Sequence, residues 1–542
     1  LSMEAKFLTP ARQSLKFSGR GEAAASSSDL SASLQHPQAL RTSPPEGTNR
    51  TVRLSDIATR ASDAVRNTGA YVSDITQPTV RLGVTGLARA GKTVFITALV
   101  HNLIAGARLP FFEAMARGRI KRAFLAPQPD DTVPRFAYEE HLAALTADPP
   151  TWPESTRAIS QLRITLEFEP QGFMRRHLGH THLHVDIVDY PGEWLLDLPL
   201  LQTSYADWSA QALGLVRHRR NMPEAAVFLD FLGTLEAHAP ADEYAAIKGA
   251  GLFRAYLAAS RGEGNALSTT APGRFLLPGD LEGTPALTFL PLVLKPDSPP
   301  PRGSLHTLVA RRYDAYVGRV VKPFFRDHFA RLDRQIVLVD ALAALNAGSD
   351  ALGNLERALA GVLSAYRTGA NTWASALFAR RIDKILFAAT KADHLHHTSH
   401  DRLEAILRAV TADAIRRAEF SGAEVKALAL AAVRATREAE VRQNAQIMPC
   451  IMGVPLPGER LGSRVFDGIK EVAVFPGDLP EDPQVALRGE GLSAEGSSGH
   501  REMRFLRFRP TRASRGDGGE ALPLPNIRLD RAIEFLIGDR LE

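Results

Sequence analysis

RLGVTGLARAGKTVFITALVHNLI, residues 81–104, is the stretch that decides the fold of this chain. It contains the pattern G-x-x-x-x-G-K-T, formed by Gly86, Gly91, Lys92 and Thr93. Such a phosphate-binding loop needs a strand before it and a helix after it. Residues 79–84 are mostly β-branched or apolar and predict the strand, while the apolar residues between Lys92 and Gly106 predict a buried helix. We therefore expect an α/β fold built around a nucleotide-binding loop.

The chemistry of phosphate binding explains the spacing of this motif. Glycines let the backbone wrap a phosphate without a Cβ in the way, and the loop N–H groups and the helix N-terminus attract its charge. We expect Lys92 to reach the β- and γ-phosphates and the Thr93 hydroxyl to reach Mg²⁺. The predicted nucleotide-binding residues of the loop are Gly86, Arg89, Ala90, Gly91, Lys92, Thr93 and Val94. The alternative is a glycine-rich turn with a structural role.

Composition places the chain among ordinary globular proteins. Of its 542 residues, 44% are hydrophobic and 23% are charged, and the net charge is +5. This charge permits an acidic partner or a membrane surface without arguing for either. The single cysteine, Cys450, excludes a disulfide framework and a multi-cysteine metal site. We interpret it as a buried small residue rather than a nucleophile.

The N-terminal region is unlike the rest of the chain. Residues 1–52 are rich in Ser, Ala and Pro and predict a disordered tail. Because residue 1 is Leu, the alternatives are a fragment, a literally translated first codon or a start at Met3. Residues 54–72 carry one apolar helical face, which would pack on the core, on a partner or, peripherally, on a membrane. No apolar run reaches the roughly 18 residues of a transmembrane helix. Because no signal peptide is recognisable, we expect a cytoplasmic protein without an integral membrane segment.

A second motif ends a predicted β-hairpin. Residues 159–168 and 183–187 show the alternating apolarity of paired strands. The second strand ends in D-x-x-G, formed by Asp189 and Gly192. A carboxylate at a strand end can hold Mg²⁺ through a water, and the glycine N–H can contact a γ-phosphate. A turn with an N-cap aspartate is the alternative.

Residues 194–330 are mostly helical in pattern. The clearest helices are 244–259 and 307–329, the second with a kink expected at Pro323. We interpret this stretch as an inserted helical domain that meets an unknown protein partner. Its basic residues are more typical of a solvated face than of a nucleic-acid groove, so we expect no nucleic-acid binding; they include Arg311, Arg312, Arg319 and Lys322.

A third motif follows two further buried strands, 335–339 and 384–389. The first ends at Asp340, which we expect to be a cap or turn residue, a second metal carboxylate being the alternative. The second ends in T-K-x-D, formed by Thr390, Lys391 and Asp393. An aspartate there accepts from the N1–H and the exocyclic amine of guanine, a donor pair that adenine lacks, so the motif predicts guanine specificity. The lysine stem would lie along the ring.

Four histidines come directly after this motif in HLHHTSH: His394, His396, His397 and His400. We interpret them as a polar loop beside the base site, with His394 contacting the nucleotide, and metal binding is the alternative. Residues 402–420 predict a helix and 425–433 a last core strand. By its order in the chain, the end of that strand, Ala432 and Val433, would present a backbone N–H to the base oxygen.

The C-terminal region gives weaker signals. Beyond residue 441 we expect irregular structure that packs on the core. Residues 489–519 are rich in Gly and Arg and predict a mobile segment, and residues 529–541 predict a closing helix.

The motifs come in the order found in GTP-binding domains, and the wider chain resembles the YcjX-like family of bacterial P-loop proteins. The stretches that carry the resemblance are VTGLARAGKTVFITALV, TWPESTRAISQLRI, DYPGEWLLDLPLL, FLLPGDLEGTP, DRQIVLVDALAALNAG, TKADHL, AAVRATRE and IRLDRAIEFLIGDRL. The resemblance runs from about residue 55 to the end of the chain. It implies a stress-linked protein that binds GTP and GDP and carries a helical insertion.

A GTP-binding domain also needs a switch segment that supplies a Thr or Ser to Mg²⁺. We choose Thr156, directly before the hairpin, with Ser155 as the second choice. Trp152 would then pack on the ribose or the base edge, and a core tryptophan is the alternative.

Two residues depart from the usual GTPase pattern. Glu193 follows the D-x-x-G where small GTPases place a water-orienting glutamine, and a carboxylate beside a γ-phosphate repels it. We therefore expect slow hydrolysis. Arg89 stands where potassium-dependent GTPases have asparagine. Our hypothesis is that its guanidinium replaces that cation, and a salt bridge to an acidic neighbour is the alternative.

Together these patterns predict a P-loop GTP-binding fold, with a mostly parallel sheet, one antiparallel strand and a large helical insertion. The expected domains are a tail (1–52), the two parts of the core (53–193 and 331–440), the insertion (194–330) and a C-terminal segment (441–542). The expected function is a slow Mg²⁺-dependent GTPase switch; the alternative is a nucleotide-dependent binding module with incidental hydrolysis. The predicted catalytic residues are Lys92, Thr93, Asp189 and Glu193, and the predicted Mg²⁺ ligands are Thr93, Thr156 and Asp189.

Overall fold

The computed structural model describes most of the chain from residue 78 onward. The described ranges are 78–86, 89–154, 158–171, 181–260, 271–294, 298–364, 382–420, 422–443, 446–488, 505–516 and 521–542. All of them lie within one compact unit, Val72–Glu542. The expected tail (1–52), the stretch 54–72 and the switch residues Ser155 and Thr156 lie outside the described residues.

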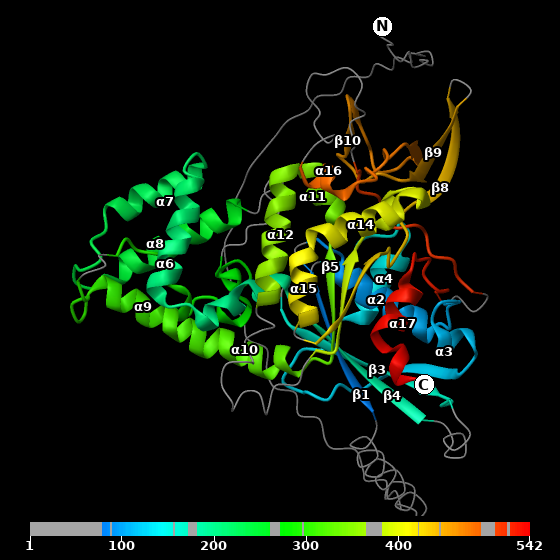
Figure 1. Ribbon diagram of the computed structural model, residues 1–542, viewed down its shortest axis with the longest axis horizontal. Helices are drawn as coiled ribbons and strands as arrows, with labels where there is room; N and C mark the ends of the chain where they lie inside the picture. Colours follow the sequence, from blue (N-terminus) through cyan, green and yellow to red (C-terminus); the bar gives the residue numbers. More distant parts are fainter. Residues whose placement is uncertain are drawn as a thin grey trace, which may run out of the picture. The chain divides into compact units, whose positions relative to one another are not determined.

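A seven-stranded sheet forms the centre of this unit (Figure 1). Its order is β2-β3-β4-β1-β5-β6-β7, and β3 alone runs antiparallel to its neighbours. This arrangement confirms the predicted α/β fold class and the predicted β3-β4 hairpin. The strands are β1 (Thr79–Gly86), β2 (Ile120–Ala126), β3 (Ser160–Phe168), β4 (Thr181–Asp189), β5 (Arg334–Val339), β6 (Lys384–Ala389) and β7 (Glu424–Ala429).

The central strands are buried on both faces, as parallel strands between two helical layers require. In β5, Ile336 and Leu338 belong to one hydrophobic core, whereas Val337 and Val339 belong to a second core on the opposite face. The first core is completed by α2 (Lys92–Ile104), α3 (Glu113–Ala116), α4 (Tyr138–Thr146) and α17 (Leu529–Ile537). The second core is completed by α11 (Ala341–Ala347), α12 (Ser349–Ser364), α14 (His400–Val410) and α15 (Ala412–Phe420).

Helices fill the chain between β4 and β5. They share a hydrophobic core that is rich in aromatic rings, among them Trp208, Phe253 and Tyr313, and in Figure 1 α6 to α9 pack against one another. The elements are the 3₁₀-helix η1 (Gly192–Gln202) and helices α6 (Tyr205–His218), α7 (Pro223–Gly233), α8 (Glu243–Ala259), α9 (Leu305–Tyr316) and α10 (Lys322–Asp327). We call the described chain from α6 to α10 the helical segment, and η1 leads into it from β4. Its status as a separate domain stays a prediction.

Two details of the helical segment differ from the expectations. The helix expected at 307–329 is interrupted by a π-helical turn at Val317–Val321, so the irregularity comes before Pro323, which opens α10. A proline fits the first turn of a helix because its missing N–H has no partner there. Arg312 is buried rather than solvated, because it shares the inner face of α9 with Val309, and its guanidinium donates to the Glu243 carboxylate.

The expectation of irregular structure beyond residue 441 is wrong. An antiparallel sheet forms there from β8 (Arg437–Gln443), β9 (Gln446–Gly453) and β12 (Val472–Val474), with a small ribbon of β10 (Arg460–Leu461) and β11 (Arg464–Val465). The charged residues of β8 hide its alternation. The edge strand β2 is likewise not predicted, because Lys121 and Arg122 interrupt its apolar pattern. The helix expected at 402–420 is divided into α14 and α15 at Thr411.

A buried arginine fixes the C-terminal helix to the sheet. Arg334, at the start of β5, is 1% exposed. Its guanidinium donates to the Asp383 and Asp539 carboxylates and to the Leu536 carbonyl. A buried guanidinium without such acceptors would be costly. The closing helix predicted at 529–541 is thus confirmed as α17 and is held against the core.

Candidate nucleotide-binding site

The predicted motifs meet at the carboxyl ends of the parallel strands. A cavity of about 650 Å³ is lined by residues that follow β1, β6 and β7, together with residues from the helical segment and the C-terminal region. Open α/β sheets bind ligands outside the carboxyl ends of their strands, where the strand order reverses. The volume is in the range of small-molecule sites. We describe its two ends separately, as the P-loop end and the T-K-x-D end.

Backbone conformation shapes the P-loop end, which consists of residues 89–94 and Glu193. Gly86 lies against β5, where a Cβ would come within 2.8 Å of the Leu338 carbonyl oxygen. Gly91 has a φ of 83°, a left-handed conformation that glycine adopts without strain. Arg89 also has a positive φ of 64°. Such a conformation is uncommon outside glycine and concentrates at functional loops.

Unsatisfied donors gather at the P-loop end. Within the described ranges, the N–H groups of Ala90, Gly91 and Lys92 donate to no other residue. Gly91 is the N-cap of α2 and has no side chain to cap the helix. The Lys92 ammonium has no carboxylate partner in the described part of the chain. The partial charges of the helix end and the lysine charge therefore all favour an anion here.

Two oxygen-bearing side chains flank this loop. The Thr93 hydroxyl lines the cavity and donates to the Glu154 carbonyl at 3.3 Å. Asp189 is buried at the end of β4, and its register partner is Val84, two residues before Gly86. Hydroxyl and carboxylate oxygens are ligands that Mg²⁺ accepts. The sheet register thus places the D-x-x-G aspartate on the strand next to the loop.

Asp393 is held in place at the T-K-x-D end. Its side chain is 3% exposed and lines the cavity. The Ala435 N–H donates to its Oδ2 at 2.7 Å, and the Thr436 hydroxyl donates to its backbone carbonyl. A carboxylate has about four acceptor positions, so the bond from Ala435 leaves capacity for ligand donors. The aspartate is therefore pre-oriented by the chain that follows β7.

Lys391 links the T-K-x-D end of the cavity to the end of β5. It has a positive φ of 62°, and its ammonium donates to the Asp340 carboxylate at the end of β5. Asp340 also accepts from the Ala343 N–H at 3.1 Å and so caps α11, which confirms the expected cap. Arg89 and Lys391 are two of the three non-glycine residues with positive φ in the described ranges, and both line the cavity.

The end of β7 offers two further donors. Ala432 and Val433 are buried and line the cavity, and their N–H groups donate to no residue in the described ranges. Their neighbours are braced, because Ala431 pairs with Ile527 in both directions and the Arg434 N–H donates to the Pro525 carbonyl. Buried N–H groups without acceptors are rare in native proteins. This pair therefore points to a ligand with an acceptor atom.

The C-terminal chain closes the T-K-x-D end, which the sequence does not reveal. Residues 505–516, part of the segment predicted to be mobile, pack into the structure, and Arg507 and Phe508 line the cavity. The Trp152 Nε1–H donates to the Phe508 carbonyl at 2.7 Å, and Phe508 packs edge-on against His394. Burial lowers the pKa of the His394 imidazole, which favours its neutral form. In the sequence, the only signal for this wall is the presence of a few hydrophobic residues within a Gly/Arg-rich stretch.

Glu193 is pressed against the helical segment. Its side chain is 6% exposed and lines the cavity, and in the described chain its carboxylate has neither a hydrogen-bond donor nor a cationic partner. The Glu193 carbonyl lies directly against Gly273, where a Cβ would come within 1.9 Å of the carbonyl oxygen. No larger residue fits at position 273 unless the backbone after the D-x-x-G moves.

Asp197 joins η1 to the helical segment through three hydrogen bonds. Its carboxylate accepts from the Gly273 N–H at 2.6 Å, from the Arg274 N–H at 3.2 Å and from the Tyr316 hydroxyl at 2.6 Å. Burial raises the pKa of the Asp197 carboxyl, and these donors oppose the rise. The Arg274 guanidinium stacks on Trp194 at 3.5 Å. Neither Asp197 nor Gly273 is predicted from sequence, because a lone Asp or Gly carries no motif.

Most predicted site residues meet at this cavity. Those that line it are Arg89, Ala90, Gly91, Lys92, Thr93, Val94, Trp152, Glu193, Thr390, Lys391, Asp393, His394, Ala432 and Val433. Of the remaining predicted residues with described positions, Gly86, Asp189 and Gly192 are not part of the lining. Trp152 lines the cavity and also packs against the hydrophobic core, and its contact with the ribose or base stays a prediction. Their roles in binding and catalysis stay predictions.

The histidine cluster is divided by the fold. His394 and His400 are buried, whereas His396 and His397 lie together beside Glu438 of β8. Cys450 is buried and unpaired with another cysteine, as expected for the only cysteine of the chain.

Comparison with known proteins identifies the family. The model of the YcjX-like family, DUF463, matches residues 80–541. The chain is 39% identical over 475 residues to "Ras-like GTPase YcjX" of Escherichia coli (strain K12), covering 85% of this chain and 96% of the relative. It is 34% identical over 487 residues to "Ras-like GTPase YcjX" of Shewanella oneidensis, covering 85% of this chain and 95% of the relative. This chain therefore belongs to the YcjX-like family.

Proposed function

We propose that this protein binds GTP and GDP with Mg²⁺ in the cavity described above, hydrolyses GTP slowly and acts as a nucleotide-dependent switch. The observation that carries the proposal is the set of unused N–H donors at both ends of one cavity, Ala90 to Lys92 at one end and Ala432 and Val433 at the other. A nucleotide presents acceptors at both of its ends. The two relatives named Ras-like GTPase support the same class of ligand.

The P-loop end would bind the phosphates. The N–H groups of Ala90, Gly91 and Lys92 would donate to phosphate oxygens, and the Lys92 ammonium would neutralise their charge. Arg89 adds a second positive charge to the lining, and its role in place of a monovalent cation stays a hypothesis.

The residues near the loop fit Mg²⁺. Thr93 and Asp189 supply a hydroxyl and a carboxylate, the hard oxygen ligands of this ion, and Thr156 is the predicted third ligand. The bond from Thr93 to the Glu154 carbonyl would be given up when the hydroxyl turns to the ion. When bound, Mg²⁺ would neutralise charge that develops on the β- and γ-phosphates.

The T-K-x-D end would select guanine. The Asp393 carboxylate would accept from N1–H and the exocyclic amine, and an N–H of Ala432 or Val433 would donate to the base oxygen. Adenine would leave both the carboxylate and the N–H group unpaired, which is the costly mismatch that gives strong selectivity. The apolar stem of Lys391 and the ring of Trp152 are the surfaces available for the base and ribose.

Glu193 sets the expected rate. Its carboxylate lines the P-loop end without a partner in the described chain, in the place where small GTPases use glutamine to orient water. Two negative groups, the carboxylate and the γ-phosphate, would repel one another. Glu193→Gln should therefore hydrolyse GTP at least several-fold faster than the wild type in single-turnover assays, with GDP affinity unchanged. A slower variant would instead show that the carboxylate takes part in hydrolysis.

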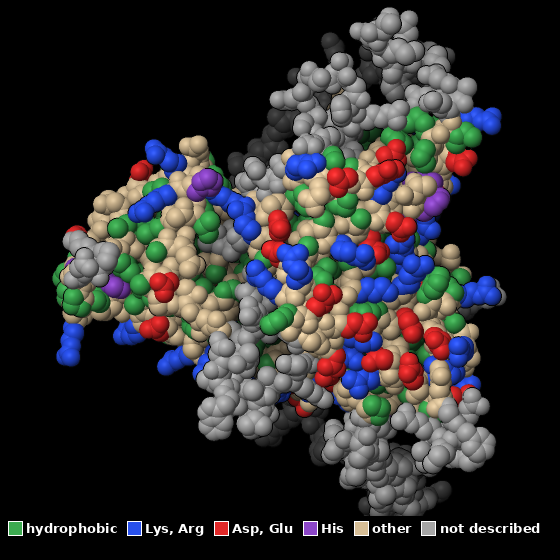
Figure 2. Space-filling model, viewed as in Figure 1, with side chains coloured by type: hydrophobic (Ala, Val, Ile, Leu, Met, Phe, Trp, Pro, Cys, Tyr) green, Lys and Arg blue, Asp and Glu red, His purple; other side chains and the backbone are tan. Residues whose placement is uncertain are grey.

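A second candidate function is a binding module whose hydrolysis is incidental. The hydrogen bonds that Asp197 accepts from Gly273, Arg274 and Tyr316 favour it, because they tie the residues after the D-x-x-G to the helical segment. The nucleotide state would then change a partner-binding surface. Val227, Tyr244 and Ile247 are exposed on α7 and α8, and Figure 2 shows hydrophobic side chains at the surface of this segment.

Other parts of the prediction remain open to test. On the face in Figure 2, the described acidic and basic side chains are interspersed. None of the helices in the described ranges is long and apolar enough to cross a bilayer. Cytoplasmic location, a stress-linked role, the protein partner, the absence of nucleic-acid binding and peripheral membrane contact all stay predictions.

Equilibrium binding of fluorescent GTP, GDP and ATP to the full chain tests the proposal. With Mg²⁺ present, GTP and GDP should bind at least about 100-fold more tightly than ATP, since the wrong base leaves buried polar groups unpaired. Equal binding of ATP and GTP would contradict the guanine site. Binding of neither would contradict a nucleotide site altogether.

A further inference from the structure

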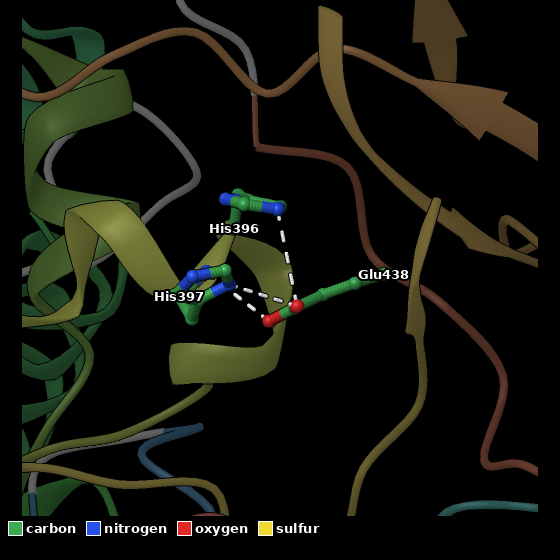
Figure 3. Close-up of side chains that lie close together, drawn as sticks. All are labelled: His396, His397 and Glu438. Atoms are coloured by element: carbon green, nitrogen blue, oxygen red, sulfur yellow. Dashed lines mark hydrogen bonds and ion pairs between the residues drawn. The ribbon is translucent and has the colours of Figure 1, made fainter. Parts of the chain in front are cut away.

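We propose that His396, His397 and Glu438 form a second metal site, separate from the predicted Mg²⁺ site, for a divalent transition metal of the Zn²⁺ type. The two histidines lie in the turn between the T-K-x-D motif and α14, and Glu438 lies on β8 (Figure 3). The site rests on these side chains alone and does not depend on the proposed function of the cavity.

The ligand atoms of the three side chains converge. One nitrogen of each imidazole and one oxygen of the Glu438 carboxylate all lie within 4.8 Å of one another. The His397 Nδ1 is 2.9 Å and the His396 Nε2 is 3.8 Å from the same Oε2 of Glu438. Ligand atoms around a four-coordinate Zn²⁺ are each about 2.0–2.2 Å from the ion. Small side-chain rotations would bring all three into that range.

The surroundings orient the ligands. The His396 Nδ1 lies 3.1 Å from the Thr398 hydroxyl, so this ring can use Nδ1 for the hydroxyl and Nε2 for the metal. A second partner on the other ring nitrogen is the usual way in which a metal-binding histidine is fixed. The His397 N–H donates to Glu438 Oε1 at 3.2 Å, which holds the carboxylate against the turn.

The hydrogen bond between His397 and Glu438 is compatible with metal binding. In the neutral ring, the hydrogen that lies between Nδ1 and Oε2 would move to Nε2 when Nδ1 coordinates the ion. The His397 side chain is 63% exposed, so solvent can reach that outer part of the ring. Three protein ligands would leave a fourth position to water.

The donor set favours particular metals. Two imidazoles and one carboxylate suit Zn²⁺, Ni²⁺, Cu²⁺ or Co²⁺ better than Mg²⁺ or Ca²⁺, which prefer oxygen ligands. This set of ligand atoms therefore differs from the oxygen ligands Thr93 and Asp189 of the predicted Mg²⁺ site. The two kinds of ion should not compete for one site.

The site lies close to the T-K-x-D end of the cavity along the chain. His396 follows Asp393 by three residues, and Glu438 follows Thr436, whose hydroxyl bonds to the Asp393 carbonyl. A bound metal would tie the turn after T-K-x-D to the start of β8. If the proposed nucleotide function holds, the metal should therefore slow nucleotide release.

The direct test is Zn²⁺ and Co²⁺ titration of the untagged, chelator-treated full chain with saturating Mg²⁺. Calorimetry should show one Zn²⁺ site, and Co²⁺ should give a visible absorption spectrum.

His396→Ala and Glu438→Gln should each weaken binding at least about tenfold. His218→Ala, which changes an exposed histidine at the end of α6, should bind as the wild type. The site would be overturned if the wild type did not bind Zn²⁺, or if the two ligand variants bound Zn²⁺ as tightly as the wild type. Circular dichroism checks that each variant is folded, and Glu438→Gln keeps the shape of the side chain.

A second measurement tests the link to the cavity. Zn²⁺ should slow the release of fluorescent GDP at least about threefold from the wild type and leave release from folded His396→Ala unchanged. If Zn²⁺ binds without changing the rate of GDP release, the link between the metal site and the cavity is refuted, whereas the metal site itself is supported. Failure of the wild type to bind GDP would refute the proposed function, and the titration would still decide the metal site.

Discussion

The two ends of the cavity are built in different ways. The P-loop end comes almost entirely from residues 89–94, a single stretch that leads from β1 into α2. The T-K-x-D end is assembled from Trp152, residues 390–394, residues 430–435 and the pair Arg507 and Phe508. A local motif fixes its own backbone, whereas the second end depends on tertiary packing across more than half of the chain.

The supports of the two ends also differ. The P-loop end is bordered by the helical segment, through the contact between Gly273 and Glu193 and the bonds of Asp197. The T-K-x-D end is supported by the C-terminal chain, through Ile527, Pro525 and Phe508. Changes in the helical segment should therefore act mainly on phosphate chemistry, and changes near the C-terminal chain mainly on base binding.

The largest effect is expected from Lys92→Ala at the P-loop end. Loss of charge-assisted bonds to two phosphates should cost about 3 kcal/mol, or roughly 100-fold in affinity. GTP and ATP should lose affinity by the same factor, because the lysine does not contact the base. Calorimetric titration measures this, with Lys470→Ala at an exposed position as the control. A change in the ratio of GTP to ATP affinity would contradict the claim that the P-loop end binds the phosphates without contacting the base.

Gly273→Ala should have the next largest effect. Its Cβ would collide with the Glu193 carbonyl, so the backbone after the D-x-x-G must shift at a cost of about 1–3 kcal/mol in the free energy of unfolding. The rate of GTP hydrolysis should change more than GDP affinity. Gly251→Ala is the control, because nothing lies within 4 Å of its Cβ position and alanine suits a helix. Equal effects of the two substitutions would contradict the close contact.

Trp152→Phe should have the smallest effect and should act on the T-K-x-D end. It removes the Nε1–H that donates to the Phe508 carbonyl and should cost about 1 kcal/mol in the free energy of unfolding. Affinity for GDP should fall more than affinity for inorganic pyrophosphate, which has no base. Thermal denaturation and competition binding measure the two quantities. An equal loss for both ligands would place Trp152 in the phosphate site.

The sequence predicts the parts of the molecule that local patterns determine. The strand and helix around Gly86 to Thr93, the β3-β4 hairpin, and the strands before Asp340 and Thr390 have strong apolar patterns and are confirmed. The T-K-x-D motif brings Asp393 to the same cavity as Lys92, as its place after β6 predicts. Strand ends in a parallel sheet meet at one edge, so order alone is informative there.

The remaining features depend on contacts that no local pattern shows. β8 carries charged residues along most of its length because the strand itself is largely exposed, and β2 carries Lys121 and Arg122 at the edge of the central sheet. Phe508 lies in a Gly/Arg-rich stretch, so its composition suggests mobility although its ring is 1% exposed. Arg312 is buried on the inner face of α9, where Glu243 of another helix and the Thr288 carbonyl accept its hydrogen bonds. In each case a distant partner decides the environment.

The most direct test of the central claim is nucleotide binding by Asp393→Asn, measured with GTP, XTP and ATP in the presence of Mg²⁺. Asparagine cannot accept from both guanine donors, but its amide can donate to the additional oxygen of xanthine. Our account predicts that GTP affinity falls by at least about 100-fold and XTP affinity rises, while ATP affinity stays weak. Unchanged GTP affinity, or an equal loss for all three nucleotides, would contradict the assignment of Asp393 as the residue that reads the base.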